Sequence, residues 1–190
     1  LRCLVGSEMC IRDREKGWDE NKLDFFRRHI VQLGRSGLFV VYDELVGKEP
    51  VEWNYLLHTV ELPMEVAEEK DGLRILGKNK ADGVSIAHLF SSQKMTYAQT
   101  DTFFVAAVDW KKRLGKTLSN HYHFTATTAS CSKICFLNVI DVHGNNRADA
   151  VINRERNRIT VEEWVIECNL EGEGNAFLYI ENKQNGVSLD

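Results

Sequence analysis

Short runs of apolar, aromatic and β-branched residues recur about every 10–15 residues along the chain, and polar turn residues separate them. Gly and Asn lie between the runs in segments such as GRSG, KNKADG and EGEGN, where tight turns need positive φ angles. This spacing is typical of strands. The predicted strands cover 27–33, 38–43, 52–60, 73–76, 84–89, 102–108, 119–127, 134–141, 148–152, 159–166 and 176–180.

One segment, DENKLDFFRRHIVQLG at 19–34, permits two interpretations. Leu23, Phe26 and Ile30 would share one face of a helix that Asp19 caps and Gly34 ends. The alternative is a strand over 27–33, which we favour.

Many short strands without a long helix predict an all-β fold, an antiparallel β-sandwich of about 10–12 short strands. Two sheets would pack face to face, and alternate residues of each strand would point into the core. The residues expected in that core are Phe39, Val41, Tyr55, Leu57, Phe136, Val139, Trp164 and Ile166.

The composition is that of an ordinary globular domain, with 190 residues, 43% of them hydrophobic and 27% charged. A chain of this length buries about 70% of its unfolded surface, so one domain is expected. No apolar run is long enough for a membrane-spanning helix. The formal net charge of −4 argues against a dedicated nucleic-acid-binding protein.

The first residues differ from the rest of the chain. The apolar run in LVGSEMCIRD is interrupted by Gly6, Ser7 and Glu8, so it does not form a signal peptide. The stretch resembles one translated reading frame of a transposase-based sequencing adaptor. We therefore expect residues 1–14 to be an artefact and residues 15–190 to be a single β-sandwich domain, the C-terminal part of a larger protein.

Two histidines and three cysteines are the candidates for metal or redox chemistry. His121 and His123 share one face of a predicted strand, a spacing that can present two imidazoles to zinc. A polar surface pair is the favoured alternative, because the sequence identifies no third ligand. Cys131, Cys135 and Cys168 lack the spacing of metal-ligand pairs and resemble small buried apolar residues, with one disulfide left open.

Three arginines and a tryptophan are candidate substrate-binding residues. Arg154, Arg156 and Arg158 alternate, so an extended strand would project all three guanidinium groups in one direction, where they could bind carboxylates or sulfates. The favoured alternative is a solvated hairpin arm, since NRERNR is also turn-like. Trp110, in the basic segment DWKKRLGK, could stack on a sugar ring or lie in a plain surface loop. No catalytic motif occurs, and no catalytic residue is predicted.

Two long segments resemble the heparinase II/III-like polysaccharide lyases. RRHIVQLGRSGLFVVYDELVGKEPVEWNYLLHT, at 27–59, is similar to the run in which an Arg-rich strand leads into YDEL and then W-x-x-LLH. NHYHFTATTASCSKICFLNVIDV, at 120–142, is similar to a later segment of the heparinase II type. The order and separation of the two segments also match. The family has Gln where this chain has His121, which argues against the two-histidine metal site.

The resemblance implies a parent enzyme with an α/α-toroid followed by antiparallel β-sheet domains. Such enzymes cleave uronic-acid-containing polysaccharides, glycosaminoglycans among them, by β-elimination. A Tyr or His base removes the C5 proton and the C4 oxygen leaves. The family's catalytic residues and zinc ligands precede the segment that matches Arg27, so none is transferred to this chain.

The expected role is therefore a non-catalytic C-terminal β-domain without a cofactor of its own, whose parent carries a structural zinc in the missing part. Its expected partners are the missing toroid and an anionic polysaccharide, and the parent would be periplasmic or extracellular. A stand-alone carbohydrate-binding β-sandwich and a purely structural scaffold are the alternatives.

Overall fold

The computed structural model describes residues 22–34, 37–60, 62–102, 121–144, 146–172 and 174–189. These residues contain fourteen strands in three antiparallel sheets and no helix, so none of them forms a helix that could cross a membrane. The predicted all-β class is confirmed. Trp110 and most of the strand predicted at 102–108 lie outside the described residues.

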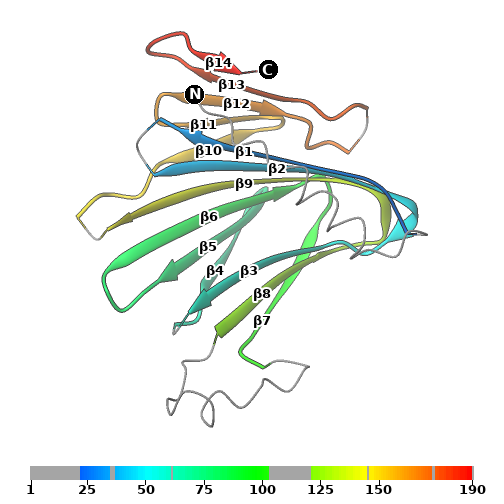
Figure 1. Cartoon of the computed structure of the whole chain (residues 1–190), viewed down its shortest axis with the longest axis horizontal. Helices are drawn as coiled ribbons and strands as arrows, with labels where there is room; N and C mark the ends of the chain where they lie inside the picture. Colours follow the sequence, from blue (N-terminus) through cyan, green and yellow to red (C-terminus); the bar gives the residue numbers. More distant parts are fainter. Residues whose placement is uncertain are drawn as a thin grey trace, which may run out of the picture.

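The central sheet has six strands in the order β1-β2-β9-β6-β5-β4, and it lies between the other two sheets (Figure 1). A C-terminal sheet of five strands covers one face, and a small sheet of three strands, ordered β3-β8-β7, covers the other. The central strands are β1 Leu23–Leu33, β2 Leu38–Val51, β9 Cys131–Gly144, β6 Gly83–Ser91, β5 Gly72–Lys78 and β4 Glu65–Glu69. The C-terminal strands are β10 Ile152–Glu155, β11 Arg158–Val161, β12 Trp164–Cys168, β13 Leu178–Asn182 and β14 Ser188–Leu189. The small sheet contains β3 Asn54–Val60, β8 His121–Thr128 and β7 Met95–Thr100.

Three layers replace the two that the sequence pattern predicted, and β9 shows why. Successive side chains of a strand point to opposite faces. Leu137 and Val139 belong to the core under the C-terminal sheet, whereas Ile134 and Phe136 belong to the core under the small sheet. A strand covered on both faces is apolar almost continuously, and residues 134–139 are all buried. Most of the predicted core residues are buried, and Phe39 and Leu57 are partly so.

Two of the crossings between the central and small sheets, from β2 to β3 and from β8 to β9, lie at one end of the molecule (Figure 1). Trp53 joins the two crossings. Its backbone exchanges hydrogen bonds with Thr128, and its Nε1 donates to the Cys131 carbonyl oxygen over 2.9 Å. The buried Trp53 therefore ties the β2–β3 crossing to the β8–β9 crossing.

The ambiguous segment at 19–34 contains a strand, as favoured, because β1 pairs along its length with β2. The turn between them requires glycine at Gly37, where φ is 83° and an added Cβ would collide with the Val142 carbonyl oxygen.

Three edge strands, β4, β7 and β14, were not predicted, and the single strand predicted at 159–166 is two strands, β11 and β12, separated by a turn at Glu162, whose φ is 49°. Glu65–Glu69 and Met95–Thr100 expose most of their residues, so they carry little apolar pattern. The predicted strand at 148–152 was placed too early. Ala150 donates its backbone N–H to the Asp141 carboxylate, and pairing begins at Ile152.

Candidate functional site

A groove of about 410 Å³ lies where the C-terminal sheet meets one end of the central sheet. Its walls come from the β4–β5 turn, the β6–β7 connection and strand β10. Polar and charged side chains dominate the lining, among them Lys70, Asp71, Ser92, Gln93, Lys94 and Arg154. The volume falls within the range of small-molecule sites, about 300–1,000 Å³.

Arg154 enters this groove because of the register of the C-terminal sheet. It lies opposite Ile159, a fully buried residue, so its side chain points inward toward the central sheet. The guanidinium carbon lies 5.2 Å from the centroid of the Phe90 ring. Nε donates to the Arg156 carbonyl over 2.8 Å, and Nη1 donates to the Asp71 carbonyl over 2.7 Å. These three contacts hold the guanidinium in one orientation.

The charge of Arg154 has no carboxylate partner among the described residues, in contrast to Arg28, Arg74 and Arg158, which each bind an acid. Burial lowers the pKa of Arg154, and the charge of Asp71 offsets part of that effect. Arginine nevertheless stays protonated in proteins. The groove therefore contains a fixed, partly desolvated cation that directly contacts two carbonyl oxygens and an aromatic ring, with the charges of Asp71 and Glu171 nearby.

The three arginines expected on one strand are not brought together. The β10–β11 turn falls at Arg156, whose φ is 55°, and it reverses the chain between Arg154 and Arg158. Arg158 points to the opposite face of the C-terminal sheet and binds Glu167 over 2.6 Å. The favoured alternative, a hairpin arm, describes Arg156 and Arg158 well, while Arg154 alone faces the groove.

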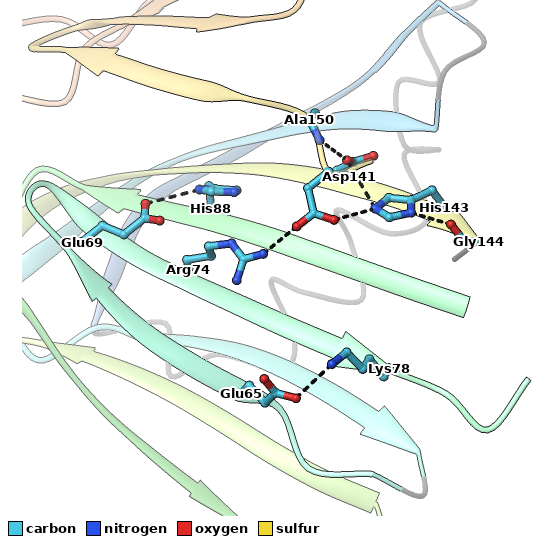
Figure 2. Close-up of polar contacts among 10 residues, drawn as sticks. Glu65, Glu69, Arg74, Lys78, His88, Asp141, His143, Gly144 and Ala150 are labelled. Atoms are coloured by element: carbon cyan, nitrogen blue, oxygen red, sulfur yellow. Dashed lines mark hydrogen bonds and ion pairs between the residues drawn. The ribbon is translucent and has the colours of Figure 1, made fainter. Parts of the chain in front are cut away.

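A charged strip, formed by Glu65, Glu69, Lys78 and His88, continues from the groove across the central sheet (Figure 2). It lies on the same face of that sheet as the C-terminal sheet, which covers this face over β1, β2 and β9. His88 Nδ1 lies 3.4 Å from Glu69 at the groove end of this strip, and Lys78 Nζ on β5 lies 3.2 Å from Glu65 on the edge strand β4. Burial lowers the pKa of His88, although Glu69 opposes the shift. The side chains of the strip come from β4, β5 and β6 and lie on the same face of the sheet.

The buried Asp141 belongs to a separate group of contacts, beside Ala150 and His143 in Figure 2. It accepts hydrogen bonds from the Ala150 N–H, over 2.8 Å, and from the Arg147 guanidinium. His143 Nδ1 donates to the Gly144 carbonyl, and its Nε2 lies 3.3 Å from Asp149, which also accepts from Arg74 over 2.9 Å. These groups neutralise one another. Their evident role is to fasten the segment that leads into β10 onto the central sheet.

The histidines form a separate group on the small sheet. His123 lies opposite His58, with ring centroids 4.4 Å apart, and His121 lies opposite Val60. Burial lowers the pKa of His58, and the neighbouring His123 and His121 add to the shift. In the ranges that the structure describes, no three His, Cys, Asp or Glu side chains are arranged to hold a metal ion. Sequence reasoning missed His58 because only the β3–β8 register places it there.

The three cysteines of the described chain are free thiols, and Cys135 and Cys168 are buried. Burial raises the pKa of Cys168 to about 12. These thiols are therefore protonated and pack as small apolar groups, and the disulfide left open by the sequence is not formed.

Comparisons with known proteins give a relation in fold alone. No family model matches the chain, and neither does any curated protein. A solved structure described as a heparinase III gene product superposes with a TM-score of 0.50 and 13% identity, over 90% of this chain and 24% of that one. A second heparinase III structure, with methylated lysines, has a TM-score of 0.39 and 13% identity, over 86% of this chain and 23% of that one. The chain thus spans about a quarter of the length of these proteins, and its β-sheet fold resembles part of heparinase III.

Proposed function

We propose that this chain is a non-catalytic C-terminal β-domain of a heparinase II/III-like polysaccharide lyase. The observation that carries the proposal is the superposition of 90% of this chain on 24% of a heparinase III chain. Two segments, at 27–59 and 120–142, resemble the same family. The first contains most of β1, β2 and β3, and the second contains β8 and most of β9. In the structure β1 pairs with β2, β3 with β8, and β2 with β9. The resemblance of these segments and the likeness in fold to heparinase III both support the proposal.

The tyrosines of the core support a non-catalytic role. Tyr42 is buried and donates its hydroxyl hydrogen to the Asn169 carbonyl over 3.1 Å. The Tyr55 hydroxyl accepts a hydrogen bond from Asn138 Nδ2 over 3.1 Å. Burial raises the pKa of both phenols, which is the opposite of what a tyrosine base needs. Neither hydroxyl lines the groove at Arg154.

In this proposal the missing part of the parent, its toroid and the first part of its β region, supplies the base, the acid and the carboxylate-neutralising groups for β-elimination, together with the structural zinc. The parent would act on a uronic-acid-containing polysaccharide in the periplasm or outside the cell. This chain would stabilise the catalytic part by packing against it.

The test compares two proteins, the chain alone and the chain joined to its upstream coding sequence. Each is incubated with heparan sulfate, alginate and polygalacturonate, and the ultraviolet absorbance of the unsaturated uronate product is followed. We expect a rise only for the longer protein. Product formation by the chain alone, or an upstream sequence without amphipathic toroid helices, would refute the proposal.

A stand-alone carbohydrate-binding β-sandwich is the second candidate, and the groove at Arg154 is the observation that favours it. This candidate predicts that the chain alone retains acidic polysaccharide and that no lyase domain precedes it. The same upstream sequence therefore distinguishes the two candidates.

A further inference from the structure

We propose that the groove at Arg154 is an anion-binding subsite that takes the carboxylate or sulfate group of an acidic sugar unit. The choice of a polysaccharide as the source of that unit rests on the proposed function, whereas the anion site itself rests on the groove.

The first support is the orientation of Arg154. A guanidinium has five N–H donors. One N–H, on Nε, donates to the Arg156 carbonyl, and one N–H on Nη1 donates to the Asp71 carbonyl. The other N–H on Nη1 and both N–H groups on Nη2 remain. Those two nitrogens form the forked edge that binds a carboxylate or sulfate through two hydrogen bonds. Because the Phe90 ring and the carbonyls already hold the side chain, little rotamer entropy is lost on binding.

The second support is the distribution of charge around the groove. Lys70 and Lys94 line the rim, and within the described chain neither forms an ion pair. Three acids line the same groove, Glu68, Glu69 and Asp71, and Glu69 contacts His88 over 3.4 Å. In the described chain Arg154, Lys70 and Lys94 form no ion pair with these carboxylates, so all three cations remain available to an anion that enters the groove.

The third support is the remaining lining, which suits a sugar better than a small free anion. Ser91, Gln93, Glu68 and Asp71 supply donors and acceptors that can bond to hydroxyl groups. A cavity of about 410 Å³ is also larger than one carboxylate or sulfate requires. The acidic groups beside the cations would repel the closely spaced phosphates of a nucleic acid. A polysaccharide with about one anion per sugar would be repelled less.

The experiment measures binding of the full chain by isothermal titration calorimetry with four polymers. Alginate presents carboxylates alone, dextran sulfate presents sulfates alone, heparin presents both, and dextran is neutral. We expect binding to at least one acidic polymer and none to dextran. The comparison of alginate with dextran sulfate identifies which anion the site takes.

The decisive variant is Arg154→Gln, which keeps much of the stem and removes the charge. It is expected to weaken binding at least tenfold, the loss typical of a charge-assisted hydrogen bond. Arg158→Gln is the matched control, because this arginine belongs to the same hairpin but faces away and binds Glu167. It should change affinity less than about twofold. Arg154→Lys should restore part of the affinity through charge alone.

Arg154 also packs on Phe90, so circular dichroism must show that Arg154→Gln is folded. If it is not, Lys70→Glu/Lys94→Glu decides the question, since it reverses the rim charge and leaves the buried contacts intact. That variant should weaken binding at least fivefold at low salt, and the difference should shrink as salt screens the rim.

The inference is overturned if the unaltered chain binds no acidic polymer, if folded Arg154→Gln binds as well as Arg158→Gln, or if the rim variant binds as tightly as the unaltered chain. These outcomes do not depend on the lyase assay. Arg154-dependent binding by a chain with no upstream toroid would support the subsite and refute the lyase assignment. An active longer protein whose β-domain binds nothing would do the reverse.

Discussion

The ion pair between Arg28 and Asp43 offers a measurable consequence of the three-layer fold. Asp43 lies on the face of β2 that the small sheet covers, and 3% of its side chain is exposed, compared with 34% for Arg28. Both carboxylate oxygens accept from Arg28, each over 2.6 Å. The carboxylate has therefore lost nearly all of its water and depends on one guanidinium.

Asp43→Asn removes the charge and keeps the shape. Breaking a fully buried pair costs about 3–5 kcal/mol, and breaking an exposed one costs about 0.2–1 kcal/mol. Because a third of Arg28 still contacts solvent, the free energy of unfolding is expected to fall by about 2–3 kcal/mol. Urea unfolding followed by tryptophan fluorescence and by circular dichroism measures the change, and agreement of the two probes establishes that unfolding is two-state.

The chain provides its own control in Arg158 and Glu167, whose contact is also 2.6 Å but whose side chains are 46% and 38% exposed. Glu167→Gln should cost less than about 1 kcal/mol. The double replacement Arg28→Met/Asp43→Leu should recover most of the stability lost in Asp43→Asn, because neither charge then remains desolvated. Equal costs for Asp43→Asn and Glu167→Gln would show that burial does not set the strength of these pairs and would refute the reasoning.

Three further changes test other parts of the fold. Gly37→Ala should destabilise by about 2 kcal/mol or more by urea unfolding, since it adds a collision to the positive φ, whereas Gly186→Ala, with φ at 69° and open space around it, should cost less. Trp53→Phe should lower stability by about 1–2 kcal/mol in the same assay, because it deletes the Nε1 bond to the Cys131 carbonyl and leaves that oxygen without this donor. Burial raises the pKa of the Cys168 thiol from its ordinary value of 9.0 to about 12. Between pH 9 and pH 12 the thiol therefore loses its proton in the unfolded chain and keeps it in the folded one. Stability should therefore fall as pH rises from about 9 to about 12, and a pH series of urea unfolding should show a smaller fall in Cys168→Ala.

The strand pattern predicted the fold class because period-two alternation and turn chemistry are local properties. The number of layers was missed, although one signal for it exists in the sequence. The run ICFLNVI at 134–140 is almost continuously apolar, as a strand buried on both faces must be. The prediction assumed one buried face per strand. A continuous run within an otherwise alternating chain would have indicated a central strand between two cores.

The candidate site was predicted only in part, because register and turns are not visible in residue spacing. The sequence pointed to Arg154 because it belongs to an alternating row of three arginines. In the structure the turn at Arg156 divides that row. The feature that distinguishes Arg154 is its inward direction opposite Ile159, which depends on how β10 pairs with β11. Phe90 and the Asp71 carbonyl, its other contacts, are more than sixty positions away in the chain, so no local motif could have found them.

The buried charges around Asp141 explain how such a groove can be held in place. Strand β10 has four residues and would define the direction of Arg154 poorly by itself. The segment before it is attached twice to the central sheet, through Ala150 to Asp141 and through Asp149 to Arg74. Arg74 lies on β5, the strand that begins at the β4–β5 turn, and that turn contributes the Asp71 carbonyl to Arg154. Strand β5 therefore takes part both in anchoring the segment before β10 and in forming the wall opposite it, while Asp141 on β9 provides the second attachment, so the direction of Arg154 depends on both attachments.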